Sequence, residues 1–191
     1  MLLDVRDTVF VSIDIQPRAR REWTEANAIP SLLREFGLVD LNAAVAHFHE
    51  TMLPNAFKVA EWAREMRIPR VFVYWAPNSK AVLDDACAPH GSFHIQAGDL
   101  VIPKTEMDAF GSSTFDVDVA KLGRKTLLMV GGHTRGCLGE TAKSGFKAGY
   151  KCVAVRDATF DVSMTRWPLG LAEVPYASIL TTAEVLKLGA L

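Results

Sequence analysis

A three-layer α/β fold around a mostly parallel sheet is the architecture that this sequence predicts. Short apolar runs rich in β-branched and aromatic residues alternate along the chain with segments of helical spacing, as a sheet covered by helices on both faces requires. Four of the runs are apolar throughout, which is typical of strands buried on both faces. No repeat, low-complexity tract or linker divides the 191 residues, so we expect a single domain over residues 1–191.

Six strands are expected in chain order: Val9–Ile15, Arg70–Trp75, Leu100–Ile102, Thr126–Val130, Cys152–Val155 and a short run near Ser178–Leu180. Between them, helical spacing predicts helices over Leu38–Phe48, Pro54–Met66, Phe115–Leu122, Gly136–Ala148 and Ala183–Leu188. Thr114, and Thr181 or Thr182, suit N-caps, and Pro54 suits a first helical position. The segment Ala76–Gly98 is the longest irregular stretch, and its length favours a lid or an interface loop.

Charge and hydropathy exclude two broad classes of function. The chain has 21 Lys+Arg against 22 Asp+Glu, a net charge of -1, so it lacks the basic surface of a general nucleic-acid binder. Its longest apolar runs are far short of the roughly 20 residues needed to cross a bilayer. Acids and an arginine interrupt the N-terminal segment, which argues against a secretion signal. We therefore expect a cytoplasmic protein with no membrane or nucleic-acid partner.

The three cysteines, Cys87, Cys137 and Cys152, are an odd number with no C-x-x-C pair. This count argues against both a disulfide framework and a structural zinc site. Cys152 lies at the start of a strand and is expected to be inert core, whereas Cys87 lies in the long irregular segment. Each cysteine is therefore interpreted singly.

Three reactive residue types follow predicted strands, where parallel sheets bind their ligands. Asp14 ends the first strand, Lys104 follows the third, and Cys137 opens the helix after the fourth. A thiol, a carboxylate and an ammonium are what amide cleavage by a cysteine requires, with the thiolate favoured by a helix N-terminus and a nearby cation. Asp14 could move the proton, while Gly131 and Gly132 allow backbone amides to approach an oxyanion.

Other interpretations of the same residues stay open or fail. His133, four residues before Cys137, could form a Cys-His pair, and Cys137 could instead be an oxidisable thiol of a redox-sensing or interaction protein. GGHTRG is not G-x-G-x-x-G and no G-K-[ST] occurs, so dinucleotide and P-loop sites fail. A phosphatase loop would need Arg six residues after the cysteine, where Lys143 stands.

Three segments, in this order and spacing, resemble the isochorismatase-like cysteine hydrolases, the family of nicotinamidases and N-carbamoylsarcosine amidase. They are VFVSIDIQ, VIPKTEMDAFGSSTFD and VGGHTRGCLGETAKSGFKAGYKCVAVRDA. The resemblance implies a triad of Asp14, Lys104 and Cys137, a thioester-type intermediate, and an oxyanion hole from the backbone amides of His133 and Cys137. It also implies a cis peptide between Gly132 and His133. Isochorismatases proper lack the cysteine, so Cys137 indicates an amidase that acts on a small amide or ureide.

Departures from the family pattern concern metal and substrate. Nicotinamidases carry a D-x-H and H-x-S-F metal site; here VYWAPNSK replaces the first motif while His90 to Phe93 keeps the second, so no metal and no cofactor are expected. If a metal were required, His90 and His94 would be the candidate ligands.

Gln16, Arg18, Trp75 and Phe110 are the candidates for substrate contact, although aromatic residues more often serve ordinary packing, as Trp23 and Trp167 also could. The Arg18, Arg20 and Arg21 cluster is either a solvated turn or a carboxylate site. Relatives assemble, and the segments 76–98 and 186–191 offer interface material, so a homo-oligomer, a dimer or a tetramer, is expected.

Overall fold

The computed structural model describes residues 3–16, 41–76 and 88–188, and its centre is one six-stranded sheet in the order β3-β2-β1-β4-β5-β6. All five strand pairs are parallel. The strands are β1 Thr8–Ile13, β2 Arg70–Trp75, β3 Leu100–Lys104, β4 Thr126–Gly132, β5 Lys151–Phe160 and β6 Ser178–Leu180. The fold class predicted from the sequence is confirmed, and each predicted strand is present. β5 runs five residues further than expected.

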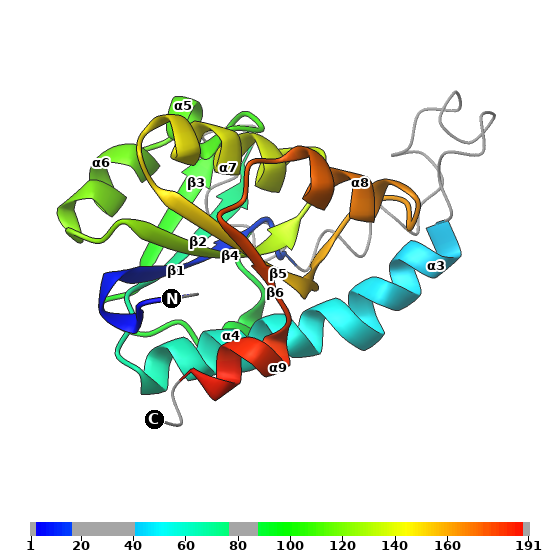
Figure 1. Ribbon diagram of the computed structural model, residues 1–191, viewed down its shortest axis with the longest axis horizontal. Coiled ribbons are helices and arrows are strands. Elements are labelled where there is room, and N and C mark those ends of the chain that lie inside the picture. Colours follow the sequence, from blue (N-terminus) through cyan, green and yellow to red (C-terminus); the bar gives the residue numbers. More distant parts are fainter. Residues whose placement is uncertain (1–2, 17–40, 77–87, 189–191) are drawn as a thin grey trace.

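Helices cover both faces of the sheet (Figure 1). Those of the described residues are α3 Leu41–Ala46, the π-helical segment η2 His47–Met52, α4 Leu53–Glu65, α5 Ala109–Ser112, α6 Phe115–Lys121, α7 Cys137–Lys147, α8 Arg166–Glu173 and α9 Thr182–Lys187, with 3-10 turns η1 Val5–Asp7 and η3 Gly91–Phe93. Figure 1 shows α5, α6 and α7 on one side of the sheet and α3, α4 and α9 on the other.

Two apolar cores follow from the alternation of side chains along each strand. On one face Phe10, Phe72 and Leu128 pack with the residues of α4. On the other face Val11 and Met129 pack with α5, α6 and α7. Because both faces are covered, the central strands β1 and β4 are buried along their whole length, as their continuous apolar runs predict.

The helix assignments differ from the prediction in three places. The two helices expected before β2 form one continuous helical run from Leu41 to Glu65, joined through η2. Pro54 fits because the carbonyl four residues before it belongs to the wider π-helical turn, where the usual clash is relieved. Thr114 occupies the N-cap of α6, but its side chain does not accept from a backbone N–H of the first turn; the hydroxyl of Ser113 accepts from the Phe115 amide at 3.1 Å instead. Helices α5 and α8 were not predicted.

Glycines bring three strands together where β4 ends. Gly131 has φ of +104°, and a Cβ on it would lie 2.0 Å from the carbonyl oxygen of Ile13 in β1. A Cβ on Gly132 would lie 2.7 Å from the carbonyl oxygen of Phe160 in β5. Both glycines are therefore needed for strand packing, which draws the carboxyl ends of β1, β4 and β5 close together.

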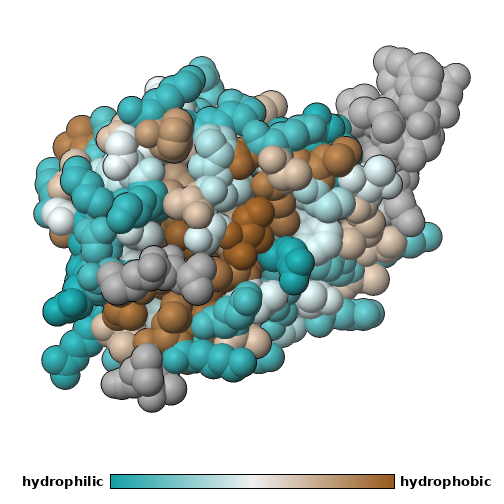
Figure 2. All heavy atoms as spheres, viewed as in Figure 1, coloured by the Kyte–Doolittle hydropathy of each residue, from teal (hydrophilic) through white to brown (hydrophobic). Residues whose placement is uncertain are grey.

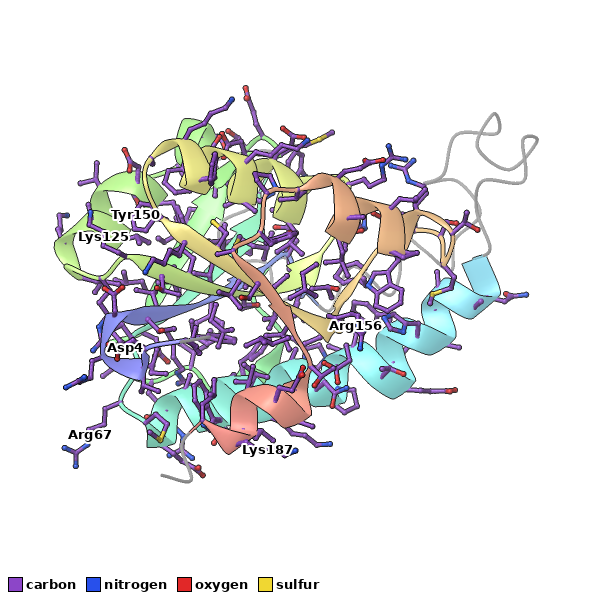
Figure 3. The ribbon with its side chains drawn as sticks, viewed as in Figure 1. Asp4, Arg67, Lys125, Tyr150, Arg156 and Lys187 are labelled. Carbon is purple, nitrogen blue, oxygen red and sulfur yellow. The ribbon has the colours of Figure 1, made fainter. Side chains whose placement is uncertain are left out.

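Two surface regions lie away from the carboxyl ends of the strands. At the amino ends of the strands, the Lys125 ammonium lies 5.4 Å from the centre of the Tyr150 ring (Figure 3). Figure 2 shows apolar residues gathered in a strip along the β6 edge, where Ile179 is 43% exposed. No helix of the described residues is long and apolar enough to cross a membrane.

Candidate active site

A buried ion pair stands at the carboxyl edge of the sheet. Lys104, the last residue of β3, is completely buried, and its Nζ lies 2.8 Å from Oδ2 of Asp14, which follows β1. The same ammonium donates to the carbonyl oxygen of Glu106 at 3.1 Å. The Lys104 side chain therefore extends past the end of β2 to reach Asp14 after β1, because β2 lies between β3 and β1 in the sheet.

Asp14 is held in an unusual conformation and keeps one oxygen unbound. Its φ of 54° is left-handed, a region that Asp enters more readily than most residues. Oδ1 is buried and has no hydrogen-bond partner among the described residues. Burial raises the pKa of this carboxyl above its usual value, and the charge of Lys104 works in the opposite direction. A buried carboxylate with an open oxygen is equipped to accept a proton.

Cys137, the first residue of α7, brings its thiol to this pair. Burial, together with the charge of Asp14, raises the pKa of the thiol to about 12, while Lys104 lowers it. The hydrogen bond with the Asp14 carboxyl also raises the thiol pKa, and the hydrogen bond with the Lys104 ammonium lowers it. Burial and the adjacent carboxylate thus act against the thiolate that the helix N-terminus and the cation favour, and the thiolate stays a prediction.

The residues around β2 close one side of the site. The half-buried Trp75 ring lies over Lys104, with Nζ 4.6 Å from its centre. Gln16 was expected to contact substrate, but its amide is bonded on both sides to the Trp75 backbone: Nε2 donates to the carbonyl at 3.1 Å and Oε1 accepts from the N–H at 2.9 Å. Gln16 therefore fixes the end of β2 beside β1, while Trp75 remains a candidate for substrate contact.

Two other expected contact residues do not belong to the site as described. Phe110 packs in the core, its ring 5.0 Å from that of Phe115 and 5.9 Å from that of Tyr150. It contacts α7 near Gly145, about two turns from Cys137, so its described contacts are packing contacts, and its role in substrate binding stays a prediction. Arg18, like Arg20, Arg21, Trp23 and Cys87, lies outside the described residues. Cys152 is buried with its Sγ 3.4 Å from the Ala142 carbonyl, which confirms it as core.

A carboxylate that the sequence analysis missed organises the loop before Cys137. Asp161 follows β5 and is buried; its Oδ2 accepts from the Thr134 hydroxyl at 3.0 Å and from the Arg135 N–H at 2.9 Å. The Gly132–His133 peptide of this loop is cis. The sequence signal for Asp161 is an acid directly after a buried strand. It was missed because this strand was expected to end at Val155, whereas β5 ends at Phe160.

The His133 imidazole lies near Asp14 and Lys104 but is not a charged partner of the Cys137 thiol. Its ring packs edge-on against Phe160, with the centres 5.1 Å apart. Burial lowers the pKa of the imidazole, which is therefore neutral at pH 7, although Asp161 and Asp14 act in the opposite direction. Since the thiol interacts with Asp14 and Lys104, the carboxylate is better placed than the imidazole to receive its proton.

His90, the histidine of the retained H-x-S-F motif, makes contacts within the fold. The Nδ1 atom of His90 accepts from the Ser92 N–H at 3.3 Å, and the His90 ring lies 5.2 Å from that of Phe57. Within the part of the chain that the structure describes, no three His, Cys, Asp or Glu side chains gather as a metal centre would need.

The site lies at the carboxyl edge of a parallel α/β sheet, where an acid, a lysine and a cysteine come together, and comparisons with known proteins place the chain in a family of this fold. Residues 8–185 match the family model of the isochorismatase domain, so this chain belongs to that family. Among solved structures, it is similar to a cysteine hydrolase from Pseudomonas syringae pv. phaseolicola 1448A, with a TM-score of 0.74, 16% identity and coverage of 98% of this chain and 94% of that one.

Two named amidohydrolases are also among the similar proteins. The N-carbamoylsarcosine amidase of Thermoplasma acidophilum superimposes with a TM-score of 0.67 and 18% identity, over 92% of this chain and 96% of that one. The ureidoacrylate amidohydrolase RutB of Variovorax paradoxus (strain S110) is 33% identical over 84 residues, which are 44% of this chain and 31% of that protein. The chain thus matches about a third of the length of this curated relative.

Proposed function

We propose that this protein is a cysteine-dependent amidohydrolase that cleaves a carbon–nitrogen bond of a small amide or ureide. The observation that carries the proposal is the meeting of Lys104 Nζ and Asp14 Oδ2 at 2.8 Å beside a thiol on which both charges act. The names of the two amidohydrolase relatives support the choice of bond. A redox-sensing role is disfavoured, because oxidation of a thiol needs no proton shuttle and would leave the Asp14–Lys104 pair without a use.

In the first half of the reaction, the carboxylate of Asp14 takes the thiol proton as the sulfur attacks the carbonyl carbon. Because burial and the charge of Asp14 disfavour the thiolate, this transfer and the attack occur together in the proposed reaction. The carbonyl electrons move onto oxygen, where the backbone N–H of Cys137 and the expected donor His133 stabilise them. The Cys137 amide lies in the first turn of α7, whose N–H groups have no acceptor within the helix.

In the second half, the tetrahedral intermediate collapses and the carbon–nitrogen bond breaks. The proton on Asp14 passes to the leaving nitrogen, which departs as ammonia or an amine, and a thioester-type acyl enzyme remains. Asp14 then takes a proton from water as the water oxygen attacks that carbonyl, and returns it to the sulfur. Lys104 keeps the carboxylate oriented throughout and balances negative charge in a site shielded from water.

The test measures ammonia release from a panel of nicotinamide, N-carbamoyl amino acids and simple ureides. Turnover of at least one compound is expected for the wild type, and Cys137→Ala should abolish it. Cys152→Ala is the matched control, since this second buried thiol also has a pKa raised to about 12 but lies among core residues. Retained turnover in Cys137→Ala, or equal loss in both variants, would contradict the proposal.

A covalent intermediate provides an independent check. Rapid quenching during turnover should yield the Cys137 peptide with the added mass of the acyl or carbamoyl group, and no such mass on Cys152. The homo-oligomer and the cytoplasmic location remain predictions. Ile179 is exposed on β6, so comparing the light scattering of an Ile179 variant with that of the wild type would test whether this edge takes part in assembly.

A further inference from the structure

The buried ammonium of Lys104 has contacts on several sides. Its Nζ lies 2.8 Å from Oδ2 of Asp14 and donates to the carbonyl oxygen of Glu106 at 3.1 Å. It also forms a hydrogen bond with the Cys137 thiol. On a further side lies the indole ring of Trp75, whose centre is 4.6 Å from Nζ. Because a lysine carries its charge on a flexible four-carbon stem, these contacts decide where the charge stays.

The sheet fixes the indole ring beside the ammonium. Trp75 ends β2 and Lys104 ends β3, and the two residues are register partners in this parallel pair. Paired residues of neighbouring strands point to the same face of a sheet, so both side chains leave it on one side. The Trp75 backbone is bonded through its N–H and its carbonyl to the Gln16 amide, and the Ala76 N–H donates to the Lys104 carbonyl at 2.9 Å. The position of the ring is therefore set by neighbouring strands and not by a loop.

An aromatic face suits this ammonium better than other side chains would. The quadrupole of an aromatic ring attracts a cation, most strongly for Trp and where water is excluded. An acid at the same place would compete with Asp14 for the charge, and an aliphatic side chain would do nothing to offset the water that the buried ammonium has lost. The indole offsets part of that cost and leaves the N–H groups of Lys104 to Asp14, Glu106 and Cys137.

We propose that Trp75 is a positioning residue, whose ring face holds the Lys104 ammonium against Asp14 and Cys137. This inference rests on the proposed function and adds a residue to the same site. A positioning role and a substrate contact differ in what they change. A ring that binds substrate acts on KM, whereas a ring that acts through Lys104 changes kcat and the reactivity of the Cys137 thiol.

Two substitutions separate the ring face from the space that it fills. Trp75→Phe and Trp75→Met both shorten the side chain and open the site to a similar degree, but only Phe keeps an aromatic face. The measurement is the rate at which iodoacetamide alkylates Cys137 in the full chain at neutral pH, followed by mass spectrometry. The thiolate is the reacting form, and the charge of Lys104 favours it. The rate should be roughly 2- to 30-fold lower in Trp75→Met than in Trp75→Phe, the range for a cation–π contact.

A Lys104→Met background tests whether the ring acts through the ammonium. With no cation beside it, the aromatic face has nothing to hold, so Trp75→Phe and Trp75→Met should give equal alkylation rates in that background. This double-mutant comparison isolates the contact between the two side chains. A difference between Phe and Met that persists without the ammonium would overturn the inference.

Turnover provides a second measurement on the same variants. In Trp75→Met, kcat should fall by a similar factor with KM nearly unchanged, and Trp75→Phe should restore most of the loss. Tyr150→Met is the matched control, because the Tyr150 ring lies 5.4 Å from another ammonium, that of Lys125, at the amino ends of the strands (Figure 3). This control should change neither kcat per folded molecule nor the alkylation of Cys137. Alkylation of the buried Cys152 reports any opening of the fold.

Three results would contradict the positioning role of Trp75. They are equal alkylation rates in Trp75→Phe and Trp75→Met, a loss of the same size in Tyr150→Met, and a rise in KM alone in Trp75→Met, which would make the ring a substrate contact. Failure of the proposed function is a separate result: the difference in alkylation between the two Trp75 variants is present, but the wild type releases no ammonia from any compound.

Discussion

Two buried ion pairs in this protein look alike at first and differ in how completely they are satisfied. Arg70, on β2, meets Asp99 through Nε and Nη2 at 3.0 and 2.6 Å, engaging both carboxylate oxygens. Its remaining donors reach the carbonyl oxygens of Ala60, Phe93 and His94 at 3.4 to 3.5 Å. Lys104 meets only Oδ2 of Asp14, and Oδ1 has no hydrogen-bond partner among the described residues.

The difference shows what each pair is built to do. A fully satisfied buried pair ties segments together, and here Arg70 joins β2, α4 and the loops after η3. A buried carboxylate oxygen that lacks a hydrogen-bond partner, such as Oδ1 of Asp14, costs free energy in the resting state, and such groups are concentrated where chemistry requires them. The Arg70–Asp99 pair is therefore expected to serve stability, and the Lys104–Asp14 pair to serve reaction. The predictions below separate these two roles.

The largest effect is expected on turnover. Asp14→Asn keeps an oxygen that can accept from Lys104 but removes the proton acceptor, so kcat should fall roughly 10²- to 10⁴-fold, the usual contribution of general acid–base catalysis. Steady-state ammonia release from the best compound of the panel gives the measurement. Asp99→Asn makes the same chemical change in the other pair, and its kcat per folded molecule should equal that of the wild type. Comparable losses in the two variants would remove the functional distinction between the pairs.

The converse effect is expected on stability. Asp99→Ala leaves the Arg70 guanidinium, which is 2% exposed, without its main partner and should lower the free energy of unfolding by about 3–5 kcal/mol. Urea denaturation followed by circular dichroism measures the change.

Asp14→Asn should cost much less stability at pH 7. Burial raises the Asp14 pKa, so the folded state favours the protonated form; any stability from that form is present at low pH and lost as pH rises through the folded pKa. At neutral pH the neutral amide therefore relieves the desolvation cost of the carboxylate, which offsets part of the loss of the counter-charge of Lys104. A loss in Asp14→Asn as large as that in Asp99→Ala would show that both pairs are structural.

Strand periodicity was sufficient to predict the sheet, but not all of the helices. The central strands are apolar throughout and could be recognised individually. Helix α8 could not, because its sequence RWPLGLAE contains Pro168 and Gly170, which disfavour helices in isolation. Its packing requires the glycine: a Cβ at Gly170 would lie 2.5 Å from the Thr134 hydroxyl oxygen. Tertiary contact with the loop before Cys137, which no local pattern contains, selects this helix.

The same limit applies to the candidate site. The carboxyl-edge rule for parallel sheets was enough to select Asp14, Lys104 and Cys137, and the structure brings the three together. The direction of the shift in the thiol pKa was not predictable, because it depends on how deeply the fold buries Cys137 and on which charges face it. The packing of Phe110 was not predictable for a related reason: only the tertiary fold brings this aromatic residue, six positions after Lys104, against the core beside α7.

The smallest and most specific effect is expected on the titration of the two described thiols. Burial raises the pKa of both Cys137 and Cys152 to about 12, but only Cys137 is also under the charges of Asp14 and Lys104. Asp14→Asn removes a charge and a hydrogen bond that raise the Cys137 pKa, so that pKa should fall, whereas Lys104→Met removes a cation that lowers it, so the pKa should rise further. Carbon-13 labelling of the cysteine Cβ atoms and NMR titration up to about pH 10, beyond the range of an ordinary thiol, would follow each group separately. Wild-type Cys137 should show no complete transition in that range, while the Asp14→Asn variant should begin to titrate within it. Cys152 should stay unchanged in both variants and so serves as the internal reference. A Cys137 signal that ignores both substitutions, or that moves together with Cys152, would mean that the reactive thiol is governed by burial alone and that its neighbouring ion pair does not act on it.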